Sequence, residues 1–256
     1  MFAECQKKFM EKWPEYFPQA RWPVAFFYSA DEAYSSLLAP PPVPGKGGSV
    51  NCLIKQVSQV FDQVDIAFSA ERIGCSGGKR YTGFSEEIQP NFRWFLSCGL
   101  EGVMEGERYK KNPEIVDLIL QKTKFLEASA PYLIFRRFDR LKAGEIPEGI
   151  IFLDQPDVIS ALFTLGEFRE VEGGVICPFA SGCASLVYYP RLEAQKENPS
   201  AVLGLFDISA RPFVEPNHFS ITLPLKKFIE MVEDLDESFL TTASWARIKA
   251  RLNSGK

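Results

Sequence analysis

The chain has 256 residues, 46% of them hydrophobic and 24% charged, with a formal net charge of -4 at pH 7. This is the composition of an ordinary globular protein that buries a sizeable core, and the length suits one large domain or two small halves packed together. The acidic balance excludes a broadly basic nucleic-acid-binding protein, because neutralising a phosphate backbone needs a clustered face of Lys and Arg.

Targeting signals and disulfides are not expected either. The N-terminal stretch MFAECQKKFMEKW carries charges every few residues and lacks the apolar core of a secretory signal. No segment approaches the roughly 20 uninterrupted apolar residues of a membrane span. We therefore expect a cytoplasmic protein whose six cysteines are reduced thiols, free to bind metal or to react.

The first half of the chain alternates apolar runs with turn-forming segments. Apolar residues that recur at the helical period predict a helix that buries one face, and continuous apolar runs predict buried strands. The predicted elements are, in order, a helix over 2–13 that ends near Pro14, a strand over 22–29, a short helix over 31–38, a helix over 51–61, a strand over 64–74, a glycine loop over 75–83 and a helix or strand over 91–98.

The proline- and glycine-rich stretch APPPVPGKGGS, at 39–49, predicts a surface loop or a flap. The sequence PGKGGS within it resembles a phosphate-binding loop only superficially. The Walker motif places Ser or Thr directly after Gly-Lys and follows a strand, whereas here prolines precede and two glycines intervene. We therefore reject a phosphate-binding loop at this position.

The second half predicts a similar alternation. A helix over 112–127 has Asn112 as its cap and Pro113 at its first position, with Ile115, Leu118 and Ile119 on one face. The remaining predicted elements are strands over 132–138 and 149–154, helices over 155–165 and 224–235, and a C-terminal amphipathic helix around Trp245, Ile248 and Leu252.

The two halves share a layout that suggests an internal duplication. FFYSADEAYSSLL and IIFLDQPDVISALF each combine a strand, a polar turn and a helix, and each is followed by glycines, a cysteine and an apolar strand that ends in AFSAER or FDISAR. Cys52 then corresponds to Cys183 and Arg72 to Arg211. The alternative is chance, because strand–helix–strand order is common. We expect an α+β fold over 1–256, with duplicated halves at about 20–110 and 130–256 packed around a mixed sheet.

The cysteines are the candidate metal ligands. A thiol in the first turn of a helix meets the positive end of the helix dipole, which lowers its pKa toward the reactive, ligating thiolate. Cys52 has this position behind Asn51, and Cys183 has it if a helix begins at Ser181 or Gly182. Four thiolates hold an iron–sulfur cluster or another metal, and the predicted set is Cys52, Cys75, Cys177 and Cys183, with Cys98 as a substitute for Cys52. The sequence has no CxxC pair, and buried free cysteines are also common as small apolar residues.

Other residues are candidate ligand contacts. Gly77 and Gly78 lie in the predicted glycine loop beside Cys75, where a ligand can approach the backbone. Arg72 and Arg211 follow equivalent strands and are suited to clamp an anion. Asp207 lies in the same segment as Arg211, and the competing interpretation is a structural salt bridge between the two.

The remaining chemistry-bearing residues give weaker signals. His218 is the only histidine and therefore the only candidate base of a Cys-His or Ser-His pair, but no neighbouring residue marks it as one. Asp31 and Asp154 occupy matching places in the two halves, which predicts helix-capping or turn carboxylates rather than a catalytic pair.

Several motifs together resemble a known family. WPVAFFY, NCLIKQVSQ, GCSGGKRYTGF, EGIIFLDQPDVISALF, FDISARPF and FSITLPLKKF are similar to domain-of-unknown-function family 169 (DUF169), which is found in archaea and bacteria. The resemblance covers roughly residues 23–252. It implies no established activity and draws attention to Cys52, to Cys75 with Gly77 and Gly78, and to the segment from Asp207 to Arg211.

Three classes of function follow from these observations. The first is a thiol-dependent metal or iron–sulfur protein. The second is a small-molecule binding module with a metal-free apolar cleft between the halves, lined by some of the 22 Phe residues and closed by the flap. The third is a structural or interaction protein in which the cysteines are only buried. No residue set is specific enough to predict a reaction.

Overall fold

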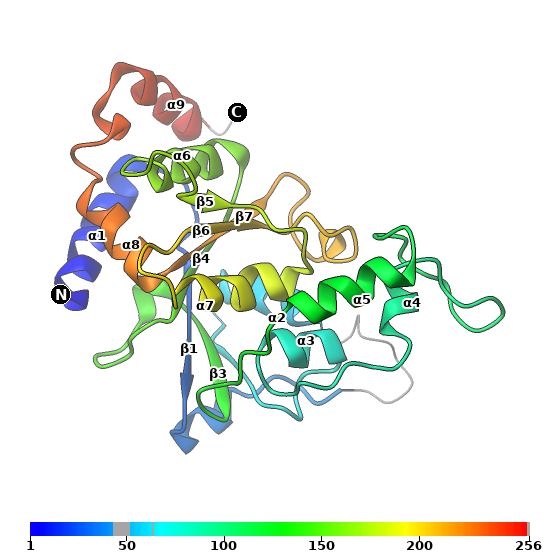
Figure 1. Ribbon diagram of the computed structural model, residues 1–256. Helices are drawn as coiled ribbons and strands as arrows, with labels where there is room; N and C mark the ends of the chain where they lie inside the picture. Colours follow the sequence, from blue (N-terminus) through cyan, green and yellow to red (C-terminus); the bar gives the residue numbers. More distant parts are fainter. Residues whose placement is uncertain (43–51, 63, 255–256) are drawn as a thin grey trace.

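A computed structural model of the chain describes residues 1–42, 52–62 and 64–254. Most of the predicted flap at 39–49, with the PGKGGS sequence, lies outside these residues. The described chain forms a seven-stranded mixed sheet with helices on both faces (Figure 1), which confirms the α+β class.

The sheet runs in the order β2-β3-β1-β4-β7-β6-β5. All neighbouring strands are antiparallel except β5 and β6. The buried strands are continuous apolar runs, as expected where helices cover both faces of a sheet. The strands are β1 (Val24–Ser29), β2 (Ile66–Phe68), β3 (Tyr132–Arg137), β4 (Gly149–Asp154), β5 (Val175–Ile176), β6 (Ala201–Gly204) and β7 (Phe219–Pro224).

Strand pairing repeats on the two sides of the contact between β1 and β4. On one side β1 pairs with β3 and β3 with β2; on the other side β4 pairs with β7 and β7 with β6. Ala25 lies opposite Ile150 where the two sides meet. An internal duplication would produce this arrangement. Because strand order alone does not establish common descent, the duplication remains a prediction.

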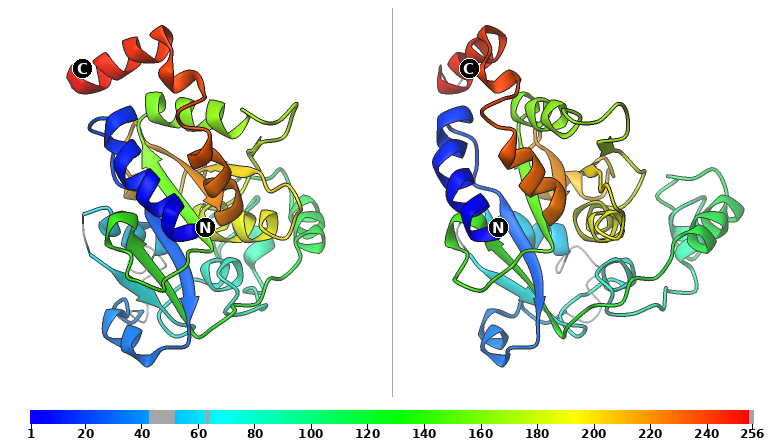
Figure 2. Two further views of the ribbon diagram at one scale, coloured as in Figure 1. Left: turned by 90° about the vertical axis from the view of Figure 1, so that its left-hand side faces the viewer. Right: turned by 60° about the vertical axis from the view of Figure 1, so that its left-hand side comes forward.

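Helices α1, α6, α8 and α9 cover one face of the sheet, and α2 with η3 covers the other (Figure 1). On the first face α1 and α8 lie side by side, whereas α4 and α5 extend away from the sheet (Figure 2). The helices are α1 (Phe2–Tyr16), α2 (Leu53–Val60), α3 (Ser76–Tyr81), α4 (Phe92–Phe95), α5 (Pro113–Lys122), α6 (Pro156–Gly166), α7 (Tyr189–Glu193), α8 (Leu225–Glu233) and α9 (Ala243–Ser254), with the 3₁₀ segments η1 (Glu32–Leu37), η2 (Phe138–Arg140), η4 (Arg211–Phe213) and η5 (Phe239–Thr241) and the π-helical η3 (Ala184–Tyr188).

Two predicted strands are shorter than the sequence indicates. The strand predicted over 64–74 is limited to β2, because a turn follows in which the Arg72 N–H donates to the Ser69 carbonyl at 3.0 Å. The FDISAR segment is not a strand: β6 ends at Gly204, and turns begin at Asp207. Both segments therefore leave the sheet as turns that carry an arginine.

Three predictions that concern helices α1, α3 and α5 also need correction. The predicted glycine loop at 75–83 is α3, because the Cys75 thiol accepts the Gly78 N–H and caps a helix. Helix α1 continues past Pro14 to Tyr16. Pro14 has no backbone N–H, but because it lies in the last turn, the helix loses only one hydrogen bond there. Asn112 does cap α5, but Ile115 and Leu118 on its predicted apolar face are exposed.

Candidate thiol site

Three of the six cysteines stand at the beginnings of helices. Cys52 is the N-cap of α2 and Cys75 is the N-cap of α3. Cys183 lies in the first turn of a helical run that begins at Gly182 and continues through η3 into α7. The predicted helix starts at Cys52 and Cys183 are confirmed. Cys75 is also at a helix start, because the segment predicted as a glycine loop is helical. We call Cys52, Cys75 and Cys183 the thiol site.

Two glycines let the elements of the thiol site approach one another. A Cβ atom on Gly78 would lie 2.9 Å from Cys75 Sγ and 4.0 Å from Cys183 Sγ, so the two sulfur atoms are no farther apart than the sum of these distances. The Gly78 N–H also donates to Cys75 Sγ at 3.2 Å. A Cβ on Gly182 would lie 2.8 Å from the Ile54 side chain, which brings the run from Gly182 against α2.

Burial favours the protonated form of the Cys75 and Cys183 thiols. It raises the pKa of Cys183 well above the ordinary value, and negative charge on Cys75, Cys52 and Asp207 raises it further. Burial also raises the pKa of Cys75, where the N–H of Gly78 opposes the shift and negative charge on Cys52 adds to it. The expectation that a helix N-terminus lowers the pKa is wrong for Cys183, because desolvation outweighs the dipole.

Asp207 lies beside Cys183 and is 3% exposed. One carboxylate oxygen accepts the Gly182 N–H, and the other accepts the Ala210 N–H at 2.7 Å. Burial raises the pKa of Asp207, and these two donors oppose the rise. The salt bridge to Arg211 considered from the sequence is not among the contacts of the described chain, so Asp207 instead fixes the beginning of the Cys183 helix.

The other predicted metal ligand and its substitute lie elsewhere. Cys177 follows β5 and is exposed, and only burial acts on its pKa, so no charge of the thiol site reaches it. Cys98 follows α4 and is also exposed. Of the predicted metal cysteines, Cys52 and Cys75 act electrostatically on Cys183, whereas Cys177 does not.

The predicted ligand arginines have structural partners. Arg72 donates to the Ala39 carbonyl at 3.4 Å. Arg211 donates to carbonyls of the loop that precedes β7, namely those of Glu215, Pro216 and His218. Gly77 differs from Gly78 in having room for a side chain, since its Cβ would lie 3.7 Å from Phe92. These contacts favour local structural roles for Arg72, Arg211 and Gly77.

His218 is partly buried at the start of β7, and its Nδ1 has no hydrogen-bond partner in the described part of the chain. Burial lowers its pKa, which Asp154 partly opposes. The Asp154 carboxylate accepts the backbone N–H groups of Arg21 and Gln155, at 2.9 and 2.8 Å. Asp154 thus ties the segment before β1 to the end of β4, as the turn-acid interpretation expects. Asp31 caps η1 through the Ala33 N–H.

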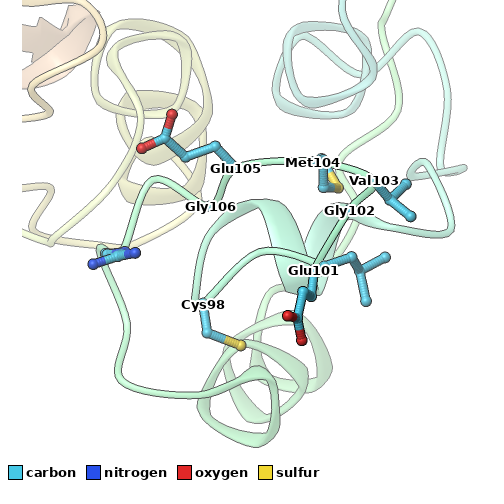
Figure 3. Close-up of a pocket in the computed structure, with 9 residues that line it drawn as sticks. Cys98, Glu101, Gly102, Val103, Met104, Glu105 and Gly106 are labelled. Atoms are coloured by element: carbon cyan, nitrogen blue, oxygen red, sulfur yellow. The ribbon is translucent and has the colours of Figure 1, made fainter.

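Two surface cavities lie away from the thiol site. The first, of about 490 Å³, is formed by the loop from Cys98 to Arg108. In it the carboxylates of Glu101 and Glu105 point in different directions (Figure 3), so they do not form a common site. The second, of about 600 Å³, lies between the start of β4, α7 and α8, and it includes Arg191, Lys226 and Ile229. Neither cavity is lined by Phe.

No group of side chains that could hold a metal is found in the part of the chain that the structure describes, and this includes the predicted cysteine ligands. There, no three or more His, Cys, Asp and Glu side chains are arranged so that they could hold a metal ion together. In the same residues, no helix has both the length and the apolar character needed to cross a membrane.

Comparison with known families gives one match. The family model of DUF169, described as "Uncharacterised ArCR, COG2043", matches residues 19–234. The chain belongs to the DUF169 family. No curated protein and no solved structure matches it. The matched range contains the thiol site and the whole sheet of this DUF169 protein, and it leaves out α1 and α9.

Proposed function

We propose that this DUF169 protein binds an iron–sulfur cluster at Cys52, Cys75 and Cys183. The observation that carries the proposal is that Cys75 Sγ and Cys183 Sγ both lie beside Gly78, and that Cys52, Cys75 and Cys183 each stand at the beginning of a helix. Thiolates are the usual ligands of such clusters. We further infer a cytoplasmic protein, where these thiols stay reduced until they bind.

A cluster and a single ion require different spacings of their thiolate ligands. A tetrahedral ion bound at about 2.3 Å holds its sulfur ligands about 3.8 Å apart. A cluster places a separate iron atom at each cysteine, so its ligands lie farther apart. At the thiol site the backbone of Gly78 stands beside both Cys75 and Cys183, which separates the two sulfur atoms.

The negative charge that the site would carry with ionised thiols also favours a cationic ligand. Cys75 and Cys183 have raised pKa values because burial and neighbouring negative charge oppose thiolate formation. A bound cationic iron–sulfur core would favour the thiolate form of these cysteines. Binding of the core would therefore release thiol protons, and it would become more favourable as the pH rises. The helix beginnings at α2 and at Gly182 then stabilise the thiolates through their unpaired N–H groups and dipoles.

Anaerobic reconstitution with ferrous iron and sulfide tests the proposal. We expect a visible absorption band and bound iron in the unmodified chain, and a loss of more than about tenfold in iron affinity in Cys52→Ser, Cys75→Ser and Cys183→Ser, since even substitutions outside the first ligand shell cost that much. Cys98→Ser and Cys177→Ser are matched controls at exposed positions and should load normally. Equal loading of all five variants would refute the site.

A metal-free binding module is the second candidate function. The cavity of about 600 Å³ beside α7 and α8 supports it, because its volume is that of a small-molecule site. Arg191 and Lys226 give the cavity cationic groups, although Arg191 already pairs with Glu148 at 3.0 Å. Native mass spectrometry of the purified protein distinguishes the two functions: a stoichiometric organic ligand without iron supports the module, and iron with sulfide supports the cluster.

A further inference from the structure

The cavity of about 600 Å³ beside α7 and α8 has apolar side chains from three segments in its lining. Pro147 precedes β4, Ala194 follows α7, and Leu225 and Ile229 lie one turn apart on α8. Leu225 and Ile229 are only half-buried, so they leave apolar surface that a ligand can cover. This part of the cavity suits the hydrocarbon portion of a small molecule.

Two of the three charged side chains in the lining neutralise each other. Arg191 Nε lies 3.0 Å from a carboxylate oxygen of Glu148. The Arg191 guanidinium also donates to the carbonyls of Leu126 and Glu127, at 3.4 and 2.8 Å. It lies over the ring of Tyr28, 4.6 Å from the ring centroid. Arg191 therefore has little hydrogen-bonding capacity left for a ligand.

Lys226 is the third charged side chain, and it forms no ion pair with an acidic side chain in the part of the chain that the structure describes. Its ammonium group donates to the Glu197 carbonyl, which uses one of its three N–H donors. Because the charges of Glu148 and Arg191 cancel, Lys226 gives the cavity a net positive charge. This charge favours an anion over a neutral or cationic ligand.

We infer that this cavity binds a small amphipathic carboxylate, with its hydrocarbon chain against Leu225 and Ile229 and its carboxylate at Lys226. The inference rests on the second candidate function, the metal-free binding module, and names the class of its ligand. Residues three and four positions apart are neighbours on a helix, so Ile229 lies beside both Leu225 and Lys226. One short ligand can therefore contact the apolar side chains and accept charge-assisted hydrogen bonds from the ammonium group.

Calorimetric titration of the unmodified protein with octanoate, octanol and octylammonium tests the inference. Octanoate should bind with one molecule per chain and at least about tenfold more tightly than the other two, because only a carboxylate pairs with the ammonium group. Hexanoate should bind about tenfold more weakly than octanoate, since it lacks two CH₂ groups. Equal affinity for the three eight-carbon probes would overturn the choice of an anion but keep the binding module. Failure of all the probes to bind would contradict the module itself.

Two pairs of variants locate the bound probe. Lys226→Met removes the ammonium group and keeps an apolar stem, so the affinity for octanoate should fall at least about tenfold. Lys122→Met, at an exposed position of α5 outside the cavity, is the matched control and should bind octanoate normally. Ile229→Trp fills the cavity and should abolish binding, whereas Ile229→Leu conserves the side-chain volume and should retain it. Undiminished octanoate binding in both Lys226→Met and Ile229→Trp would place the probe elsewhere and contradict the inference.

Discussion

Gly78 and Gly77, adjacent in α3, have different surroundings. A Cβ on Gly78 would lie 2.8 Å from Ile73 and 2.9 Å from Cys75 Sγ, whereas a Cβ on Gly77 would be in ordinary contact with Phe92. We expect Gly78→Ala to lower the free energy of unfolding by about 1–3 kcal/mol, the cost of overpacking, and to displace the Cys75 thiol. Denaturant unfolding measures the first effect and iron loading the second.

Gly77→Ala is the matched control. It adds the same methyl group to the same helix without a steric conflict, so it should leave stability unchanged or raise it by up to about 1 kcal/mol through helix propensity. If both alanine variants are equally stable and load iron equally, close packing at Gly78 does not position the site.

Cys5 lies outside the thiol site, and its ionisation makes the free energy of unfolding depend on pH in the alkaline range. Burial and the nearby Glu233 carboxylate raise the pKa of Cys5 to about 12. In the unfolded chain a cysteine ionises near pH 8.5, so between about pH 8.5 and 12 the unfolded state has lost a proton that the folded state retains. Stability therefore falls as the pH rises, with a slope of up to about 1.4 kcal/mol per pH unit from this thiol.

Comparing Cys5→Ala with the unmodified protein isolates this effect. The variant should lose less stability between pH 8.5 and 10 in denaturant titrations of the metal-free protein, although it begins from a lower value because a buried side chain is truncated. Parallel pH profiles for the two proteins would show that Cys5 ionises equally in both states.

Some residues of the thiol site could be recognised from the sequence alone. Cys52 and Cys183 were recognisable because each precedes a helical apolar pattern, and Asp207 was singled out as a ligand contact. Its position beside Cys183 was not predictable, because a contact between the loop after β6 and a helix beginning 25 residues earlier is a tertiary feature. Burial, which reverses the pKa shift expected for Cys183, also depends on the assembled fold.

At the scale of the element, β3 carries two adjacent arginines with different roles. The Arg136 side chain is 2% exposed and pairs with Asp65 at 2.9 Å and with Glu145. We expect Arg136→Met to lower the free energy of unfolding by about 3–5 kcal/mol, because removing one partner of a buried pair leaves carboxylates that are poorly compensated. Urea unfolding measures the change.

Arg137→Met is the control on the same strand. Arg137 pairs with Asp139, and the two side chains are 16% and 17% exposed, so more solvent reaches this pair than reaches Arg136 and its loss should cost less, about 1 kcal/mol. A similar loss of stability in the two variants would mean that the Arg136 pairs contribute no more than a surface ion pair.

Element types were predictable where one pattern dominates. The apolar run of β4 and the capped helix α5 were predicted from composition and capping alone. The sequence failed where tertiary contacts decide: β2 contains only three residues because pairing with β3 ends there, and α3 forms despite two glycines because the Cys75 thiol caps it. The two glycines of this segment therefore led to the wrong prediction of a loop at the thiol site.

At the scale of the whole molecule, the two faces of the sheet have separate cores. Trp245 of α9 is buried among the aromatic residues of the α1 face and donates through its indole N–H to the Tyr16 carbonyl at 3.1 Å. The thiol site lies on the opposite face. Trp245→Ala should therefore lower the free energy of unfolding by about 3–5 kcal/mol while the folded protein loads iron normally. Loss of iron binding in a variant that is still folded would show that the two faces are coupled.

The central claim is that the DUF169 chain folds to bring Cys52, Cys75 and Cys183 together as cluster ligands. The most direct measurement is the iron and acid-labile sulfide content of the native protein purified without oxygen, with its visible spectrum. The account predicts iron and sulfide in near-equal amounts, with an absorption band that disappears in Cys183→Ser. Native protein free of iron and sulfide, with these three thiols titratable only after unfolding, would contradict it.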